Sequence, residues 1–175
     1  MTIQLKPSAC APPWIKPWLI YQASLTDRLR LTSGDSQLSV LRGRWDRANT
    51  WDKHLFSMDK GVVFHREIIT WVEKIPCWYA RTIIPISTYQ ASPSFFDKLQ
   101  DHALGTLIFN EPRIKRIHMQ HYQIQAEGSL EYSWVHRWLP DSQDPLWVRL
   151  SLFSLSANPP FALVEILLPG LESYA

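Results

Sequence analysis

Residues 78–87 read WYARTIIPIS, and our expectation of the fold starts from this stretch. It alternates as a β-strand does, which places Tyr79, Arg81 and Ile83 on one face and the residues between them on the other. Because a guanidinium does not lose its charge, an arginine on a largely apolar face must reach water, pair with a carboxylate or bind an anionic ligand. Arg81 is therefore the first candidate for a functional residue.

A second charge, Glu165, interrupts the apolar stretch FALVEILLP at 161–169. Both faces of this predicted strand are apolar, which is typical of a central strand and indicates that the carboxylate is at least half buried. A buried charge without a partner costs about 3–5 kcal/mol, so Glu165 needs a cation, a hydrogen-bond donor or a proton. A structural ion pair with Arg66, Arg81 or Arg149 meets this need as well as a catalytic role does, and the residues alone leave both interpretations open.

The composition indicates a packed globular protein. The 175 residues are 46% hydrophobic and include nine tryptophans, so we expect a single domain at 1–175 with a proline-rich arm at 1–20. The net charge of +2 gives no reason to expect nucleic acid or a membrane surface as a partner. The two cysteines, Cys10 and Cys77, form no disulfide framework, and the amino terminus lacks the apolar core of a signal peptide. We therefore expect a cytoplasmic protein without stable membrane insertion, and a monomer.

The amino-terminal part predicts an arm followed by a short helix. Prolines within the first seventeen residues favour an extended arm without helix, which Trp14 and Trp18 would dock onto the core. Ser24 or Thr26 would then cap a short helix. The residues that this helix would present to the core are Leu25, Leu29 and Leu31.

Strand-like alternation recurs along the rest of the chain. The predicted strands are 37–45, 61–71, 78–87, 114–125, 129–138, 146–154 and 161–168. The loop VEKIPC, which contains Pro76, would join the second and third of these as an antiparallel hairpin, and GS at 128–129 predicts another hairpin turn. Ser92 starts a helix over 93–107 that Gly105 would break. This pattern predicts an α+β fold in which short helices cover one side of an antiparallel sheet and leave a pocket between the two layers.

Other patterns that carry chemistry are weak. His118 and His121 have the spacing of metal ligands on a helix, but the surrounding RIHMQHYQIQ favours a strand, on which they face opposite ways. The sequence contains no HExxH, no nearby cysteine pair, no GxSxG, no phosphate-binding loop and no dinucleotide fingerprint. The basic cluster at 113–116 lacks the interleaved aromatic residues of a nucleic-acid site. We therefore expect neither a metal nor nucleic acid.

Five short motifs, in order, resemble those of the chorismate pyruvate-lyase (chorismate lyase) family. They are SLT at 24–26, REI at 66–68, ARTIIPIS at 80–87, ALGTLIF at 103–109 and LVEILLPG at 163–170. Together they extend over residues 24–170, which is nearly the whole chain. The succession of ARTIIP, LG and a glutamate inside a terminal ILLP strand is more specific than any one motif.

The resemblance implies a fold, a reaction and a set of site residues. Members of this bacterial family have a six-stranded antiparallel sheet whose helices close over an internal site. Without metal or organic cofactor, they eliminate pyruvate from chorismate to give 4-hydroxybenzoate for ubiquinone biosynthesis. Carried over to this sequence, Arg81 would bind the ring carboxylate and Glu165 would meet the ring hydroxyl as the catalytic residues. Backbone groups of Leu25 and Leu104 would complete the substrate-binding site.

One departure from the family keeps an alternative open. Family members often carry two adjacent arginines shortly after the tryptophan of the penultimate strand, whereas LWVRLSLF has Leu150 after Arg149. A protein that binds an aromatic acid without turning it over is therefore the alternative. Ligand-sensing domains of bacterial transcription regulators also resemble the lyases in fold, but they normally carry an acidic residue near the position of Arg81 and follow a DNA-binding domain. Arg81 itself, and the short stretch before residue 24, favour the lyase.

Overall fold

The computed structural model describes residues 10–100, 104–143 and 145–175, and these residues build a six-stranded sheet in the order β1-β2-β3-β6-β5-β4. The strands are β1 (Gln37–Arg47), β2 (Val62–Val72), β3 (Ile75–Pro85), β4 (Ile114–Ile124), β5 (Leu146–Leu155) and β6 (Phe161–Leu167). Every neighbouring pair is antiparallel. The predicted α+β class and its six-stranded antiparallel sheet are confirmed.

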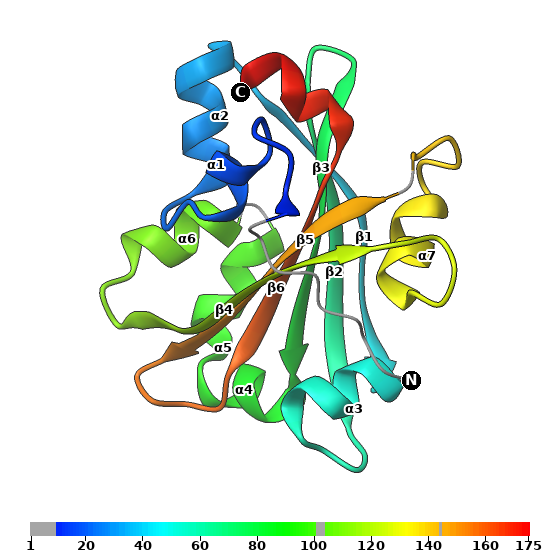
Figure 1. The fold of residues 1–175 in the computed structure, drawn as a ribbon. Coiled ribbons are helices and arrows are strands. Elements are labelled where there is room, and N and C mark those ends of the chain that lie inside the picture. The colour runs from blue at the N-terminus through cyan, green and yellow to red at the C-terminus, as the bar shows by residue number, and fades with distance from the viewer. Residues whose placement is uncertain (1–9, 101–103, 144) are drawn as a thin grey trace.

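Helices pack on both faces of this sheet (Figure 1). One face is covered by α1 (Lys16–Leu19), α2 (Leu25–Ser33), α4 (Ile86–Ala91), α5 (Pro93–Phe96), α6 (Leu104–Asn110) and the 3₁₀ segments η2 (Asp97–Gln100) and η3 (Pro169–Tyr174). The other face is covered by α3 (Thr50–Phe56) and α7 (Leu130–His136). The sequence predicted the first layer of helices, and the second is an addition to it.

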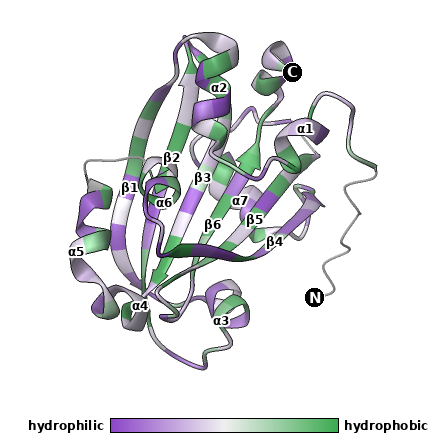
Figure 2. Cartoon of the chain, turned by 90° about the vertical axis from the view of Figure 1, so that its left-hand side faces the viewer, coloured by the Kyte–Doolittle hydropathy of each residue, from purple (hydrophilic) through white to green (hydrophobic). Residues whose placement is uncertain are grey.

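The core therefore consists of two layers that share the central strands β3 and β6. Tyr79 and Ile83 of β3 pack toward α3 and α7, whereas Trp78 of the same strand packs with Trp18 and Leu29 of the opposite layer. Figure 2 shows how hydrophobic and hydrophilic residues are distributed along the strands. Successive side chains of a strand point to opposite faces, so the apolar residues of β3 and β6 contribute to both layers. No helix in the described part of the chain is both long and apolar enough to cross a membrane.

The amino-terminal segment docks as predicted but is not wholly extended. Trp18 is fully buried, and Trp14 packs against the same core cluster. The short helix α1 starts at Lys16, with a proline in its first turn, so the expectation of no helix up to residue 17 is wrong at its end. The first part of the predicted arm, at 1–9, lies outside the described residues.

Helix α2 starts where the sequence predicts. Ser24 is its N-cap and accepts a hydrogen bond from the backbone N–H of Asp27 at 3.2 Å. Leu25 and Leu29 are buried, but Leu31 is 85% exposed, so its predicted place in the core is wrong. The 3.6-residue turn of the helix carries residue 31 away from the stripe that residues 25 and 29 form.

Three of the sequence predictions are wrong in the type, length or end of an element. The segment predicted as a strand at 129–138 contains α7, and Ser129 is its N-cap instead of part of a hairpin turn. The β2–β3 turn consists of Glu73 and Lys74, so Pro76 lies inside β3 and not in a longer loop. Gly105 lies within α6 and does not break the helix there.

Candidate active site

A pocket lies between the sheet and the starts of α2 and α6, which cover the same face (Figure 1). All six strands contribute to its floor, and Ser24, Leu25, Leu104 and Gly105 contribute to its roof. Its apolar wall includes Ile68, Trp78, Leu163 and Phe109. The shape and the aromatic lining suit a flat six-membered ring with polar groups at its edge.

The register of the strands decides which polar side chains reach this pocket. Arg66 lies opposite Thr82, and Glu165 lies opposite Ala80 on one side and Arg149 on the other. Residues directly opposite each other in an antiparallel pair share a face of the sheet. Arg66, Glu165 and Arg149 therefore line one pocket although they come from three different strands.

Glu165 and Arg149 form a buried ion pair at the centre of the pocket floor. The two residues are 6% and 1% exposed, and Nη1 of Arg149 lies 3.3 Å from Oε2 of Glu165. Burial raises the pKa of the Glu165 carboxyl, and the positive charges of Arg149 and Arg116 oppose that rise. Arg149 Nη2 also donates a hydrogen bond to the carbonyl oxygen of Ala23, at 3.2 Å, just before α2. This arginine is one of the three partners that the sequence offered for Glu165.

Arg66 supplies a second buried guanidinium. It is 5% exposed and lines both this pocket and a neighbouring cavity that Trp45, Phe64 and Tyr89 help to form. Burial lowers the pKa of the guanidinium, which nevertheless remains protonated at neutral pH because a guanidinium is a very strong base. A charged fork in an apolar pocket is the arrangement that binds a carboxylate through paired hydrogen bonds.

A third arginine, Arg116 of β4, lines the pocket from its far side. The register of β4 shifts between Arg116 and His118, next to Ile117, and this irregularity accompanies the turn of Arg116 toward the pocket. Arg116 Nη1 donates to the carbonyl oxygen of Gln22 at 2.8 Å, and its Cζ lies 5.7 Å from the ring centre of Phe109. Arg116 thus contacts both segments of the roof.

The roof helices meet at a glycine. A Cβ atom added to Gly105 would lie 3.3 Å from Oγ of Ser24, which is closer than most side-chain contacts allow. Leu25 and Leu104, the predicted backbone contacts of the ligand, are the first residues of α2 and α6 and both line the pocket. The structure therefore brings Leu25, Leu104 and Glu165 together.

Arg81 lies on the opposite face of the sheet, beneath α7. Its Nε is 3.8 Å from Oε1 of Glu67, and its Cζ lies 4.3 Å from the ring centre of Trp134. Trp138 Nε1 donates to the other oxygen of Glu67 at 2.9 Å. The prediction that Arg81 shares a pocket with Glu165 is wrong, because the strand register sets Arg81 one residue out of phase with Glu165. Arg66 takes the position that the sequence interpretation gave to Arg81.

The departure at Leu150 also concerns the opposite face. Leu150 belongs to the core cluster beneath α3 and α7, and it does not line the pocket. Arg66 and Arg116 are charged residues of the pocket that the sequence interpretation did not place in the site. The strand at 61–71 carried the signal for Arg66, because pairing with β3 aligns it with Thr82 and hence with the pocket face.

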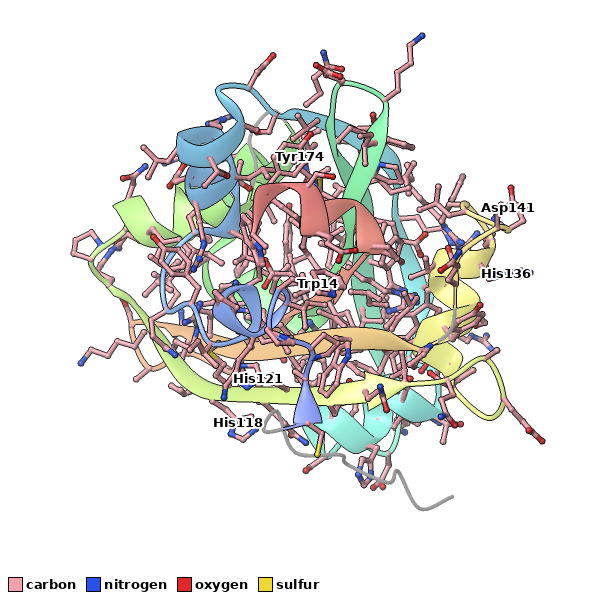
Figure 3. The ribbon with its side chains drawn as sticks, turned by 45° about the horizontal axis from the view of Figure 1, so that its top comes forward. Trp14, His118, His121, His136, Asp141 and Tyr174 are labelled. Carbon is pink, nitrogen blue, oxygen red and sulfur yellow. The ribbon has the colours of Figure 1, made fainter. Side chains whose placement is uncertain are left out.

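The histidines of β4 do not form a metal site. Figure 3 shows His118 and His121 on this strand, where they lie opposite Leu152 and Arg149, residues of different faces. The predicted strand and the predicted divergence of the two side chains are confirmed. Among the residues that the structure describes, no group of three or more His, Cys, Asp or Glu side chains is arranged to hold a metal ion.

Solved structures with a similar fold include ligand-sensing domains of transcription regulators. The effector domain of PhnF from Mycobacterium smegmatis has a TM-score of 0.59 at 12% identity, with 86% of this chain and 91% of that domain covered. The carboxy-terminal domain of the histidine utilization repressor from Pseudomonas syringae has a TM-score of 0.54 at 14% identity, with 81% and 94% covered. At these identities the likeness shows a common fold and nothing of the function.

Sequence relatives give more specific information. A protein named "Probable chorismate pyruvate-lyase" from Psychromonas ingrahamii is 29% identical over 177 aligned positions, which cover 97% of this chain and 90% of that protein. One of the same name from Thiobacillus denitrificans is 26% identical over 162 positions, with 92% and 86% covered. The model of the family "Chorismate lyase" matches residues 4–172. The protein therefore belongs to the chorismate lyase family, and it is a lyase.

Proposed function

We propose that the protein eliminates pyruvate from chorismate to form 4-hydroxybenzoate, the first committed step of ubiquinone biosynthesis, in the pocket beneath α2 and α6. The observation that carries the proposal is the presence of Arg66 and Glu165 on one face of the sheet, in a single pocket with apolar walls. A carboxylate and a hydroxyl at opposite ends of a six-membered ring match these two groups.

Arg66 binds the ring carboxylate in this proposal. A guanidinium fork donates two parallel hydrogen bonds to a carboxylate, and each charge-assisted bond contributes about 1.5–3 kcal/mol. Water is excluded by the roof, where Leu25 and Leu104 cover the ligand. The first backbone N–H groups of a helix lack an acceptor within the helix, so the N–H of Leu25 can add a donor.

Glu165 binds the ring hydroxyl and orients it. Its pKa is raised by burial, so its carboxyl group lies closer to exchanging a proton at neutral pH than an exposed glutamate does. Arg149, 3.3 Å away, fixes the position of one carboxylate oxygen. Glu165 can thus hold the hydroxyl-bearing carbon in place and assist movement of the proton at that carbon.

The reaction needs orientation more than it needs strong acids or bases. The C–O bond between the ring and the enolpyruvyl group breaks, a proton leaves the neighbouring ring carbon, and the proton ends on the departing group, which becomes pyruvate. Formation of the aromatic ring supplies the driving force. The pocket contributes by holding the ring flat between apolar walls and by stabilising the charge that develops on the departing oxygen.

The test is to mix the protein with chorismate and to quantify 4-hydroxybenzoate and pyruvate together. We expect equal amounts of both, and an Arg66→Gln variant should lower kcat/KM by at least tenfold because the loss of a charge-assisted bond costs about 1.5–3 kcal/mol. Arg81→Gln is the matched control, since it removes the same charge from the opposite face of the sheet. Glu165→Ala should reduce turnover by more than threefold; a smaller effect would exclude its catalytic role.

Two outcomes would contradict the proposal. If no product forms above the spontaneous background while 4-hydroxybenzoate still binds tightly, the protein is a non-catalytic binder of an aromatic acid. If Arg81→Gln abolishes turnover while Arg66→Gln does not, the wrong pocket has been chosen.

A further inference from the structure

The pocket carries more positive charge than one ring carboxylate requires. Among the described residues that line it, Arg116, Arg149 and Glu165 carry one net positive charge when Glu165 is ionised, and this count leaves out Arg66, to which the ring carboxylate is assigned. Because a buried charge is costly without a partner, the end of the pocket at Arg116 and Arg149 predicts a second negative charge on the ligand.

The order of the strands separates these charges into two ends. Arg66 lies on β2, Glu165 on β6, Arg149 on β5 and Arg116 on β4, and the sheet runs β2-β3-β6-β5-β4. Neighbouring strands are about 4.8 Å apart, so Arg66 and Arg116 stand at opposite ends of the pocket floor with Glu165 between them. Arg116 and Arg149 form one positive end, and Arg66 forms the other.

Part of the hydrogen-bonding capacity at the Arg116–Arg149 end is left over after the bonds to Gln22 and Ala23. Within the part of the chain that the structure describes, Nε and Nη1 of Arg149 and Nε of Arg116 are buried and donate no hydrogen bond, and Oε2 of Glu165 accepts none. Arg149 is 1% exposed, so bulk solvent does not serve its donors. A buried donor without an acceptor costs about 1–3 kcal/mol, which a ligand oxygen placed there would recover.

We propose that Arg116 and Arg149 bind the carboxylate of the enolpyruvyl group, while Arg66 binds the ring carboxylate. The inference rests on the proposed function and adds the residues that recognise the second anion. The enolpyruvyl group stands on the ring carbon next to the hydroxyl-bearing carbon, which Glu165 holds, so its carboxylate extends away from Arg66. The product keeps only the ring carboxylate, so this half of the site distinguishes the dianionic substrate from the monoanionic product.

Both arginines also hold the roof, and this contact provides the competing explanation. Arg116 donates to the carbonyl oxygen of Gln22 and Arg149 to that of Ala23, the residues that lead into α2. If Arg116 served only to fix the roof, its loss would weaken the binding of every ligand that the roof covers by a similar factor. If Arg116 binds the second carboxylate, its loss would weaken the binding of chorismate alone.

The experiment compares two ligands in matched variants. We would measure KM for chorismate and Kd for 4-hydroxybenzoate in the wild type, in Arg116→Gln, in Arg116→Lys and in the control Lys115→Gln, which removes the adjacent exposed charge. For Arg116→Gln we expect KM for chorismate to rise at least tenfold and Kd for 4-hydroxybenzoate to change less than threefold. Arg116→Lys should recover part of the chorismate affinity, and Lys115→Gln should resemble the wild type. Thermal unfolding identifies any variant that fails to fold. If Arg116→Gln fails, Arg116→Lys, which keeps the charge, is compared with the wild type in its place.

The remaining outcomes separate the two proposals. Equal shifts for both ligands, or no shift for either, would overturn the role of Arg116 in recognising the second anion. If the wild type binds chorismate without turning it over, the proposed function fails. The Kd for chorismate then replaces KM, and comparison of its change in Arg116→Gln with the change in Kd for 4-hydroxybenzoate still decides whether Arg116 recognises the dianion. Because Arg149 is the ion-pair partner of Glu165, its substitution is a less specific test and is left to measurements of stability.

Discussion

We expect substitutions in the buried pair of Arg149 and Glu165 to lower the stability of the protein, in one case to an extent that depends on pH. At the observed separation of 3.3 Å, Coulomb's law with an effective dielectric constant of about 20 gives an attraction of about 5 kcal/mol. Much of this offsets the desolvation of two groups that are 1% and 6% exposed. Removal of one partner therefore leaves an uncompensated buried charge, and we expect a loss of about 3–5 kcal/mol in the free energy of unfolding.

The two single substitutions should differ in their dependence on pH. In Glu165→Gln neither residue of the pair titrates, because glutamine carries no acid and Arg149 cannot release its proton, so this site should add nothing to the pH dependence of the variant's own stability between about pH 5 and about pH 8. In Arg149→Met, Glu165 can escape its penalty by binding a proton. Its pKa in the folded protein is already raised by burial and should rise further, so the folded state binds the proton more tightly than the unfolded state does. Stability is then highest below the unfolded pKa of about 4.3 and falls as the pH rises through the folded value.

Urea unfolding followed by tryptophan fluorescence measures these differences. The double variant Arg149→Met/Glu165→Gln contains neither charge and should be more stable than Glu165→Gln alone, since replacement of a buried pair by uncharged groups is often near neutral. The reasoning would be refuted if both single variants lost less than about 1 kcal/mol, or if Arg149→Met lost the same amount at both pH values. The first result would mean that the pair is solvated, and the second that Glu165 takes up no proton.

Two further substitutions test the remaining assignments. Arg81→Gln removes the ion pair with Glu67 and the stacking on Trp134, so we expect the free energy of unfolding to fall by about 2–4 kcal/mol. The Kd for 4-hydroxybenzoate, measured by titration, should stay within threefold of the wild type. A parallel loss of affinity would contradict the placement of Arg81. Gly105→Ala should push the roof helices apart, because its Cβ would lie 3.3 Å from Oγ of Ser24, and product dissociation in a stopped-flow displacement experiment should accelerate severalfold. Alanine also favours a helix over glycine by about 1 kcal/mol, so the free energy of unfolding is measured as the control for this separate effect. An unchanged rate of product dissociation would show that the contact does not hold the pocket closed.

The strands could be predicted from the sequence because their alternation is local, whereas α7 could not. The stretch LEYSWVH is rich in aromatic and β-branched residues, which favour a strand. Its helical form depends on contacts that are remote in sequence. Glu131 accepts hydrogen bonds from Trp51, 80 positions away, and from Tyr122. A local signal is Ser129, whose side chain accepts a hydrogen bond from the backbone N–H of Tyr132 and caps the helix.

The candidate site, like the fold, could be predicted from the sequence only in part. Glu165 could be identified because a carboxylate in a strand with two apolar faces requires a partner wherever the strand lies. The choice among arginines could not be made in the same way. Alternation shows which residues of one strand share a face, but the register between strands decides which faces coincide. The expectation of a longer loop before β3 left that register open. The turn at Glu73 and Lys74, together with the register shift between Thr70 and Trp71, aligns Arg66 with Thr82 and sets Arg81 opposite Glu67.

The two faces of the sheet thus hold similar ion pairs with different consequences. Arg81 and Arg149 are both buried and each lies near a glutamate. Among the residues that the structure describes, Nε of neither arginine has a hydrogen-bond acceptor. What separates them is the surroundings. The aromatic ring of Trp134 covers Arg81, which lines neither cavity on the other face of the sheet, whereas Arg149 borders the pocket, into which a ligand oxygen can fit. A buried arginine in an apolar strand therefore indicates an anion site only when a cavity adjoins it. In this fold the register of β2, β3 and β6 places Arg66 and Glu165 on the face that has the pocket and Arg81 on the opposite face.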